Sequence, residues 1–291
     1  MGRSAGCTPG GAVAATWGFP ASGWVLRHCR PEVSRWPTSA DAVSAGVHNR
    51  VVHSRFDTRT AIVLPGTGSD ARFAADAFSA AFDGVGLTTI AVEPDPADVV
   101  QSYLSALDDA ADRHGRIVVA GISLGAAVAV RWAADHASNT TALALALPAW
   151  TGDPTGSPAA LSAEFTARSL REHGLDAVTA AMAASSPPWL ARTLRRSWAA
   201  QWPALPDALD QAARYRSLEP DELARIELPA IVVGAVDDAV HPIEVARQWA
   251  RALPNCELRT VTLDDIGRDP GCLGRAAVDG LDGRSTHPPS C

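Results

Sequence analysis

The feature that most constrains the fold is a regular alternation of short apolar segments and longer amphipathic segments between residues 60 and 147. The apolar segments have no polar face, which is typical of parallel strands buried on both sides. We predict strands over Thr60–Leu64, Leu87–Val92, Ile117–Ala120 and Ala142–Leu147, separated by helices over Ala71–Phe82, Asp98–His114 and Leu124–His136. This pattern predicts an α/β fold, a mostly parallel sheet with helices on both faces.

The alternation stops after Trp150 and returns at Ala230. Helical segments are expected in the interval, over Ala159–His173, Asp176–Ala184, Trp189–Trp202 and Asp207–Tyr215. Beyond it we predict strands Ala230–Val233 and Glu257–Leu263 and helices Ile243–Leu253 and Cys272–Leu281. The expected organisation is an α/β core of residues 46–150 and 226–283, interrupted by a helical cap over residues 151–225.

Residues 1–45 differ from the rest of the chain, because they are rich in Gly, Pro, Ser and Trp and have no sustained periodicity. We expect a disordered leader there, with Trp24–Leu26 and Asn49–Phe56 as candidate short strands. Pro20 and polar residues interrupt the mildly apolar stretch Gly10–Leu26, so no membrane span is expected.

Composition excludes several classes of function. A formal net charge of −7 argues against nucleic acid as a partner, since phosphate binding requires a concentrated basic face. The chain has no lysine, so Schiff-base, pyridoxal and P-loop chemistry are excluded. The five cysteines are scattered and never spaced C-x-x-C, which favours neither zinc nor a disulfide framework and indicates a reducing, cytoplasmic setting. We expect no metal and no cofactor.

The candidate nucleophile is Ser123, in Gly121-Ile122-Ser123-Leu124-Gly125. The motif follows an apolar strand and opens a helix, which is the context of a nucleophile elbow. A second match, Gly2–Gly6, lacks both flanking elements and is taken as chance. The cramped turn requires both glycines, lifts the serine hydroxyl off the sheet and directs the Leu124 N–H toward a developing oxyanion. The alternative is a serine that merely caps a helix.

Together with Leu64-Pro65-Gly66-Thr67-Gly68-Ser69-Asp70 and Asp237-Asp238-Ala239-Val240-His241-Pro242, this motif makes Thr60–Leu281 resemble the α/β-hydrolase superfamily. The resemblance implies an eight-stranded-type sheet and a helical cap inserted where residues 151–225 fall. It also implies that the Thr67 N–H is the second oxyanion donor. The family's acid stands four residues before a proline, which selects Asp238, with Asp237 as the substitute.

The general base departs from the family pattern. The family places a histidine after the last strand, but the segment after Leu263 contains none, and Arg268 stands near the expected position. His241, in the same loop as Asp238, is the best substitute; His287, or no histidine at all, are the other possibilities. The remaining histidines have ordinary explanations.

Three functions remain open. The first is a serine hydrolase that acts on a small-molecule carboxylic ester or thioester. The second is a hydrolase-fold protein that has lost hydrolysis and binds a ligand or partner. The third is a dinucleotide-binding protein, because Gly66–Ala71 fits G-x-G-x-x-A and Glu93 ends the next strand. The insertion contains Trp189, Trp198 and Trp202, and Trp150 precedes it. These tryptophans indicate either an apolar face that selects the substrate or simple packing of the insertion onto the core.

Overall fold

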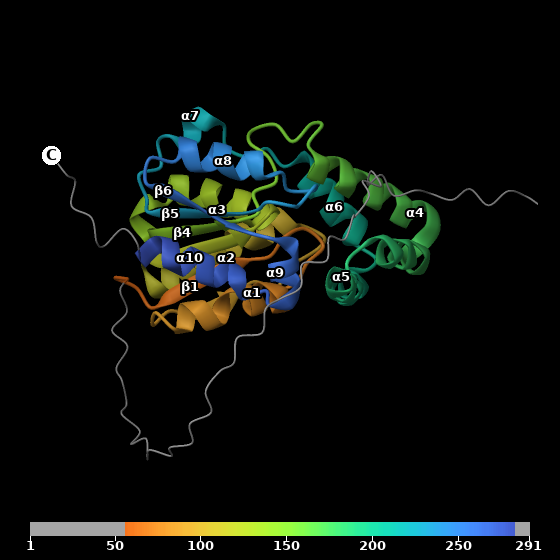
Figure 1. Ribbon diagram of the computed structural model, residues 1–291, viewed down its shortest axis with the longest axis horizontal. Helices are drawn as coiled ribbons and strands as arrows, with labels where there is room; N and C mark the ends of the chain where they lie inside the picture. The colour runs from red at the N-terminus through yellow and green to blue at the C-terminus, as the bar shows by residue number, and fades with distance from the viewer. Residues whose placement is uncertain (1–55, 283–291) are drawn as a thin grey trace, which may run out of the picture. The chain divides into compact units, whose positions relative to one another are not determined.

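The computed structural model describes residues 56–282, which contain one six-stranded sheet (Figure 1). The strands are β1 (Thr60–Leu64), β2 (Thr88–Ala91), β3 (Ile117–Ile122), β4 (Thr140–Ala146), β5 (Ala230–Ala235) and β6 (Cys256–Val261). Their order is β2-β1-β3-β4-β5-β6, and every neighbouring pair is parallel. The predicted α/β fold class is confirmed.

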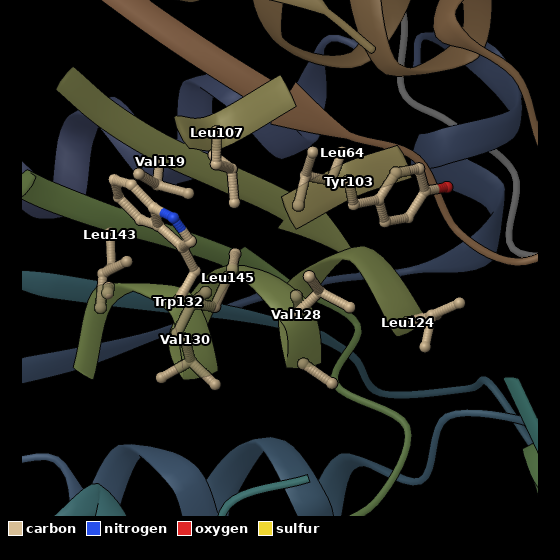
Figure 2. Packing of buried hydrophobic residues seen from close by; sticks show 14 of the residues in the cluster. Leu64, Tyr103, Leu107, Val119, Leu124, Val128, Val130, Trp132, Leu143 and Leu145 are labelled. Carbon is tan, nitrogen blue, oxygen red and sulfur yellow. The ribbon is translucent and has the colours of Figure 1, made fainter. Parts of the chain in front are cut away.

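The inner strands β1, β3 and β5 are buried over every residue because both faces of the sheet are covered there, whereas the edge strands β2 and β6 are partly exposed and carry polar residues. In β3, Ile117 and Val119 belong to one hydrophobic cluster, whereas Val118 and Ala120 belong to the other. The first cluster is completed by α2 (Val99–His114), α3 (Leu124–Asp135) and α8 (Ile243–Ala252), and the second by α1 (Ala71–Asp83) and α10 (Cys272–Asp282). Figure 2 shows the first face, where Leu107 and Trp132 pack close to Val119 and Leu143. Burial on both faces is the condition that parallel strands require.

The inserted segment between β4 and β5 is helical, as expected. It contains α4 (Pro158–Ser185), α5 (Pro188–Gln201), α6 (Leu205–Arg214) and the short α7 (Pro220–Leu223). Gly174, with φ of 77°, breaks α4 between the two helical segments that the sequence predicts. Figure 1 shows α4, α5 and α6, here called the inserted helices, grouped to one side of the sheet and its covering helices. α7 was not expected; it packs beside α8.

One loop expectation is wrong. The resemblance places a loop after the last strand and no helix is predicted there, but the structure has α9 (Leu263–Arg268). A 3₁₀ turn, η1 (Ala137–Asn139), also follows α3. α9 begins with a capping box, because the Thr262 hydroxyl accepts from the Asp265 N–H at 3.1 Å and the Asp265 carboxylate accepts from the Thr262 N–H at 3.1 Å. The sequence signal for this helix is Thr262 followed three residues later by an acid.

Several expectations lie outside the described residues. These are the leader 1–45, the candidate strand Trp24–Leu26, Asn49–Phe56 except for its last residue, and His287. The sheet of residues 56–282 has six strands, whereas the resemblance implies an eight-stranded-type sheet. Within this range, no helix combines the length and apolar character needed to cross a membrane.

Candidate active site

Ser123 lies at the sharp bend between β3 and α3, in a backbone conformation that a non-glycine residue adopts only under strain. Its φ is 55° and its ψ is −115°. The flanking glycines are required by close packing: a Cβ on Gly121 would overlap the backbone of Gly125, and a Cβ on Gly125 would overlap the carbonyl oxygens of Leu64 and Pro65. Strain of this kind persists only where the surrounding structure enforces it. The bend therefore has the geometry of a nucleophile elbow rather than of an ordinary helix cap.

Three side chains predicted from the sequence meet at this bend. His241 Nε2 lies 2.9 Å from Ser123 Oγ, and His241 Nδ1 lies 2.8 Å from Asp238 Oδ2. An ionised Asp238 can only accept, so the proton of a neutral His241 resides on Nδ1 and leaves Nε2 free to accept from the Ser123 hydroxyl. This is the arrangement that a serine needs in order to lose its proton to a base.

The loop between β5 and α8 holds both members of the pair. Asp238 Oδ1 accepts from the backbone N–H of Val240 at 2.8 Å and of His241 at 3.2 Å, so one carboxylate oxygen closes the turn and the other orients the imidazole. The side chains of Asp238 and His241 are 9% and 18% exposed. Burial raises the pKa of the Asp238 carboxyl, but the charge and hydrogen bond of His241 and the two backbone donors outweigh it and hold this pKa below its usual value.

The two backbone amides expected to stabilise an oxyanion belong to the elbow and to the loop that packs against it. Leu124 is the first residue of α3. The loop that contains Thr67 lies against the elbow, since a Cβ on Gly66 would come within 3.3 Å of the Ser123 Cβ. Within the part of the chain that the structure describes, neither the Leu124 nor the Thr67 N–H has a protein acceptor. Both are available to a ligand oxygen.

The substitute acid Asp237 and the residue near the family's histidine position, Arg268, are engaged elsewhere. Asp237 Oδ1 accepts from the Leu263 N–H at 2.8 Å and so fixes the start of α9. Arg268 is exposed on α9, where it pairs with Asp264 and Asp265 at 3.2 Å each. The residue near the family's usual histidine position therefore binds carboxylates of its own helix.

The glycine-rich loop does not leave the N-terminus of α1 open for a phosphate. Asp70 Oδ1 accepts from the Phe73 N–H at 2.9 Å, and Glu93 Oε2 accepts from the Ala71 N–H at 3.0 Å. A dinucleotide requires these amides for its pyrophosphate and the carboxylate for its ribose. Both elements of the fingerprint are used within the protein.

The tryptophans of the insertion mostly pack onto the core, as the second interpretation of them expects. Trp189 is stacked near Phe73, with ring centroids 6.3 Å apart, and lies against Gly267. Trp198 is buried against Gly68, and Trp150 donates its indole N–H to a backbone oxygen at 3.0 Å. Trp202 is 39% exposed.

Fold and site together define a hydrolase-fold protein whose elbow serine is hydrogen-bonded to a histidine, which is in turn hydrogen-bonded to an aspartate. The chain belongs to the alpha/beta hydrolase family, whose model matches residues 9–267. No curated protein sequence gives a significant match.

Solved structures with the same fold include three of low sequence identity. The enol-lactonase from Burkholderia xenovorans LB400 is 18% identical, with a TM-score of 0.59 over 78% of this chain and 92% of that one. MenH from S. aureus is 14% identical, with a TM-score of 0.58 over 80% and 97%. A carboxylesterase structure from Nitrososphaera gargenis is 13% identical, with a TM-score of 0.58 over 72% and 84%. At these identities the likeness establishes the fold alone.

Proposed function

We propose that this chain is a serine hydrolase that cleaves a carboxylic ester or thioester through Ser123. The observation that carries the proposal is the unbroken hydrogen-bonded series from Ser123 Oγ to His241 at 2.9 Å and on to Asp238 at 2.8 Å. The strained φ of 55° at Ser123 supports it, because the backbone maintains that conformation against its energetic cost.

Acylation begins when Ser123 Oγ attacks the carbonyl carbon and His241 Nε2 takes the hydroxyl proton. The carbonyl oxygen becomes an oxyanion that accepts from the N–H groups of Leu124 and Thr67. Asp238 stabilises the imidazolium formed at His241 and keeps its ring oriented. When the tetrahedral species collapses, the bond to the alcohol or thiol breaks, and the leaving group takes the proton from His241 Nε2.

Deacylation repeats these steps with water as the nucleophile. His241 takes a proton from the water as its oxygen attacks the acyl carbon bound to Ser123. Collapse then breaks the bond to Ser123 Oγ, which recovers the proton from His241, and a carboxylic acid is released. The same two backbone amides serve both halves of the reaction.

Carbonyl substrates fit this mechanism because the site offers two backbone amides for the one oxygen that becomes negatively charged. The fold shared with an enol-lactonase and a carboxylesterase agrees with an ester-type substrate. The cytoplasmic location expected from the cysteine pattern remains a prediction.

The second candidate is a hydrolase-fold protein that only binds a ligand or partner. It was suggested by the lack of a histidine after the last strand. The position of His241 removes the main reason for it, since a base within 2.9 Å of Ser123 Oγ is what hydrolysis requires. A dinucleotide-binding function has less support, because Asp70 and Glu93 occupy the amides at the start of α1.

A fluorophosphonate probe and 4-nitrophenyl acetate test the proposal. Wild type should be labelled and should hydrolyse the ester, and Ser123→Ala should do neither. His241→Gln should lower the rate of both reactions by about 10²–10⁴-fold. His136→Gln is the matched control, since His136 stacks on Trp132 and bonds to its carbonyl oxygen; it should react like wild type. Wild type that is neither labelled nor active would favour the binding function.

A further inference from the structure

The loop of residues 65–70, here called the oxyanion loop, is fixed by side chains that come from outside it. The hydroxyl of the buried Tyr103, on α2, donates a hydrogen bond to the Pro65 carbonyl oxygen at 3.0 Å. Inside the loop, the Ser69 N–H donates to the Gly66 carbonyl oxygen at 3.0 Å. These two bonds leave the carbonyl oxygens of Gly68 and Ser69 without a backbone donor among the described residues.

Helix α5 of the insertion supplies the remaining bonds. Ser197 Oγ donates to the Gly68 carbonyl oxygen at 2.6 Å, and Gln201 Nε2 donates to the Ser69 carbonyl oxygen at 2.6 Å. One helical turn separates the two donors, so they meet two successive carbonyl groups of the loop. Arg196, beside them, forms a two-pronged ion pair with Asp70 at 2.8 and 2.9 Å.

The Ser197 contact is directed at the loop rather than at its own helix. A helical serine usually donates to the carbonyl oxygen one turn earlier, but here those acceptors, on Thr193 and Leu194, lie 3.2 and 3.3 Å away. The Gly68 oxygen is much closer, and no other donor reaches it from the described residues. A buried carbonyl group left without a donor costs free energy, so the bond to Gly68 is favoured.

The hydrogen bonds from Ser197 and Gln201 to the oxyanion loop are shielded from water. Ser197 is 0% exposed and Gln201 is 4% exposed, so water does not compete for the same carbonyl groups. Gly68 adopts a positive φ of 69° directly under the indole of Trp198, with room for no side chain there. The carbonyl oxygens of Pro65, Gly66, Gly68 and Ser69 thus all accept hydrogen bonds. The Thr67 N–H between them, in the loop that lies against the elbow, has no acceptor among the described residues.

We propose that Ser197 and Gln201 are positioning residues for catalysis: through the carbonyl oxygens of Gly68 and Ser69 they hold the Thr67 N–H at the oxyanion site. This inference rests on the proposed hydrolase function. It gives α5 a role in the chemical step, beyond covering the substrate. A donor that moves away from the developing charge stabilises the transition state less, while ground-state binding of the substrate changes little.

The test uses Ser197→Ala, which removes one oxygen atom, and Gln201→Met, which keeps the side-chain length and removes the donor. Each should lower kcat for 4-nitrophenyl acetate by about 10–100-fold with KM close to that of wild type, as expected for a partly displaced oxyanion donor. Each should lower the rate of fluorophosphonate labelling by a similar factor, since that reaction also forms a charged oxygen at the same site. Thermal unfolding establishes that each variant is folded.

Gln211→Met is the matched control. Gln211 ties α6 to the core by the same kind of contact, accepting from the Val99 N–H at 3.0 Å and donating to the Ala97 carbonyl oxygen at 2.7 Å, away from the oxyanion loop. It should keep the wild-type kcat even if it unfolds at a lower temperature. A general loosening of the insertion would affect all three variants alike, whereas loss of loop positioning affects only Ser197→Ala and Gln201→Met.

Each outcome decides between the ideas. A wild-type kcat in both loop-contact variants, or a raised KM with unchanged kcat, overturns the positioning role. An equal fall in kcat in Gln211→Met also overturns it. If wild type itself neither reacts with the probe nor hydrolyses esters, the hydrolase function fails and the positioning role falls with it. If Gln201→Met does not fold, the smaller Ser197→Ala change decides the question.

Discussion

Replacing Ser123 with glycine and, separately, with alanine measures the backbone strain at the elbow without reference to catalysis. Both variants lose the hydroxyl and its hydrogen bond to His241, so that loss cancels in the comparison. What remains is the difference between a residue with a Cβ and one without, at φ of 55° and ψ of −115°. Glycine tolerates positive φ at no steric cost.

The magnitude follows from two opposed effects. A non-glycine residue in a sparsely populated conformation costs about 1–3 kcal/mol. Glycine costs about 0.5–1 kcal/mol more conformational entropy than alanine on folding. Ser123→Gly should therefore be more stable than Ser123→Ala by about 1–2 kcal/mol. In a domain of this size, that difference raises the melting temperature by about 2–8 °C.

The assay is thermal unfolding of both variants by circular dichroism, with Ala127→Gly as the control. Ala127 is buried in the first turns of α3, in ordinary helical conformation, so glycine there should destabilise the protein by about 1 kcal/mol. The expected signs are opposite at the two positions. If Ser123→Gly melts at or below Ser123→Ala, the turn stores no strain and the elbow is an ordinary helix start.

Three further predictions concern the neighbouring residues. Asp238→Asn should lower kcat by about 10⁴-fold, because an amide that donates toward His241 favours the wrong ring tautomer. Since the folded-state pKa of Asp238 lies below its usual value, the ionised carboxylate stabilises the wild type at neutral pH. The wild type, more than Asp238→Asn, should lose stability in urea unfolding as the pH falls below the usual carboxyl pKa and through this lowered pKa. Gly125→Ala should yield no soluble protein, or a free energy of unfolding lowered by about 3 kcal/mol or more, because its Cβ overlaps backbone oxygens that cannot move aside. Arg196→Gln should cost about 1–2 kcal/mol in denaturant unfolding, because it leaves the buried Asp70 carboxylate unpaired, and should raise the pKa of Asp70.

The architecture could be predicted from the sequence because the inner strands are apolar on both faces and the covering helices have an apolar side. The segments Thr60–Leu64 and Ile117–Ala120 carry this signal over every residue, and the structure places both within the central part of the sheet. The short helices α7 and α9 were not predicted because they have too few residues to show a helical repeat of apolar positions. Their signals are local capping residues instead, such as Thr262 and Asp265 at the start of α9.

The contacts around the oxyanion loop could not be predicted in this way. Ser197 and Gln201 are polar residues on an amphipathic helix, and in the sequence they look like residues on a solvated face. Their acceptors lie in a loop more than a hundred residues earlier, and the pairing exists only once the insertion has docked on the core. A local pattern carries no information about such a contact, since the bond depends on how two separately formed units meet.

The position of His241 shows that the general base can come from a different loop than in the family while its hydrogen bonds to the serine and the acid are kept. An acid and a base on separate loops can be placed independently, but Asp238 and His241 share one loop with only two residues between them. The two oxygens of Asp238 have different partners. Oδ1 accepts hydrogen bonds from two backbone N–H groups and closes the turn, and Oδ2 is hydrogen-bonded to the imidazole of His241. Because the same turn stands beside the elbow, the far nitrogen of His241 reaches Ser123 without help from the segment after β6. That segment is then free to form α9, whose first residue is held by the neighbouring Asp237.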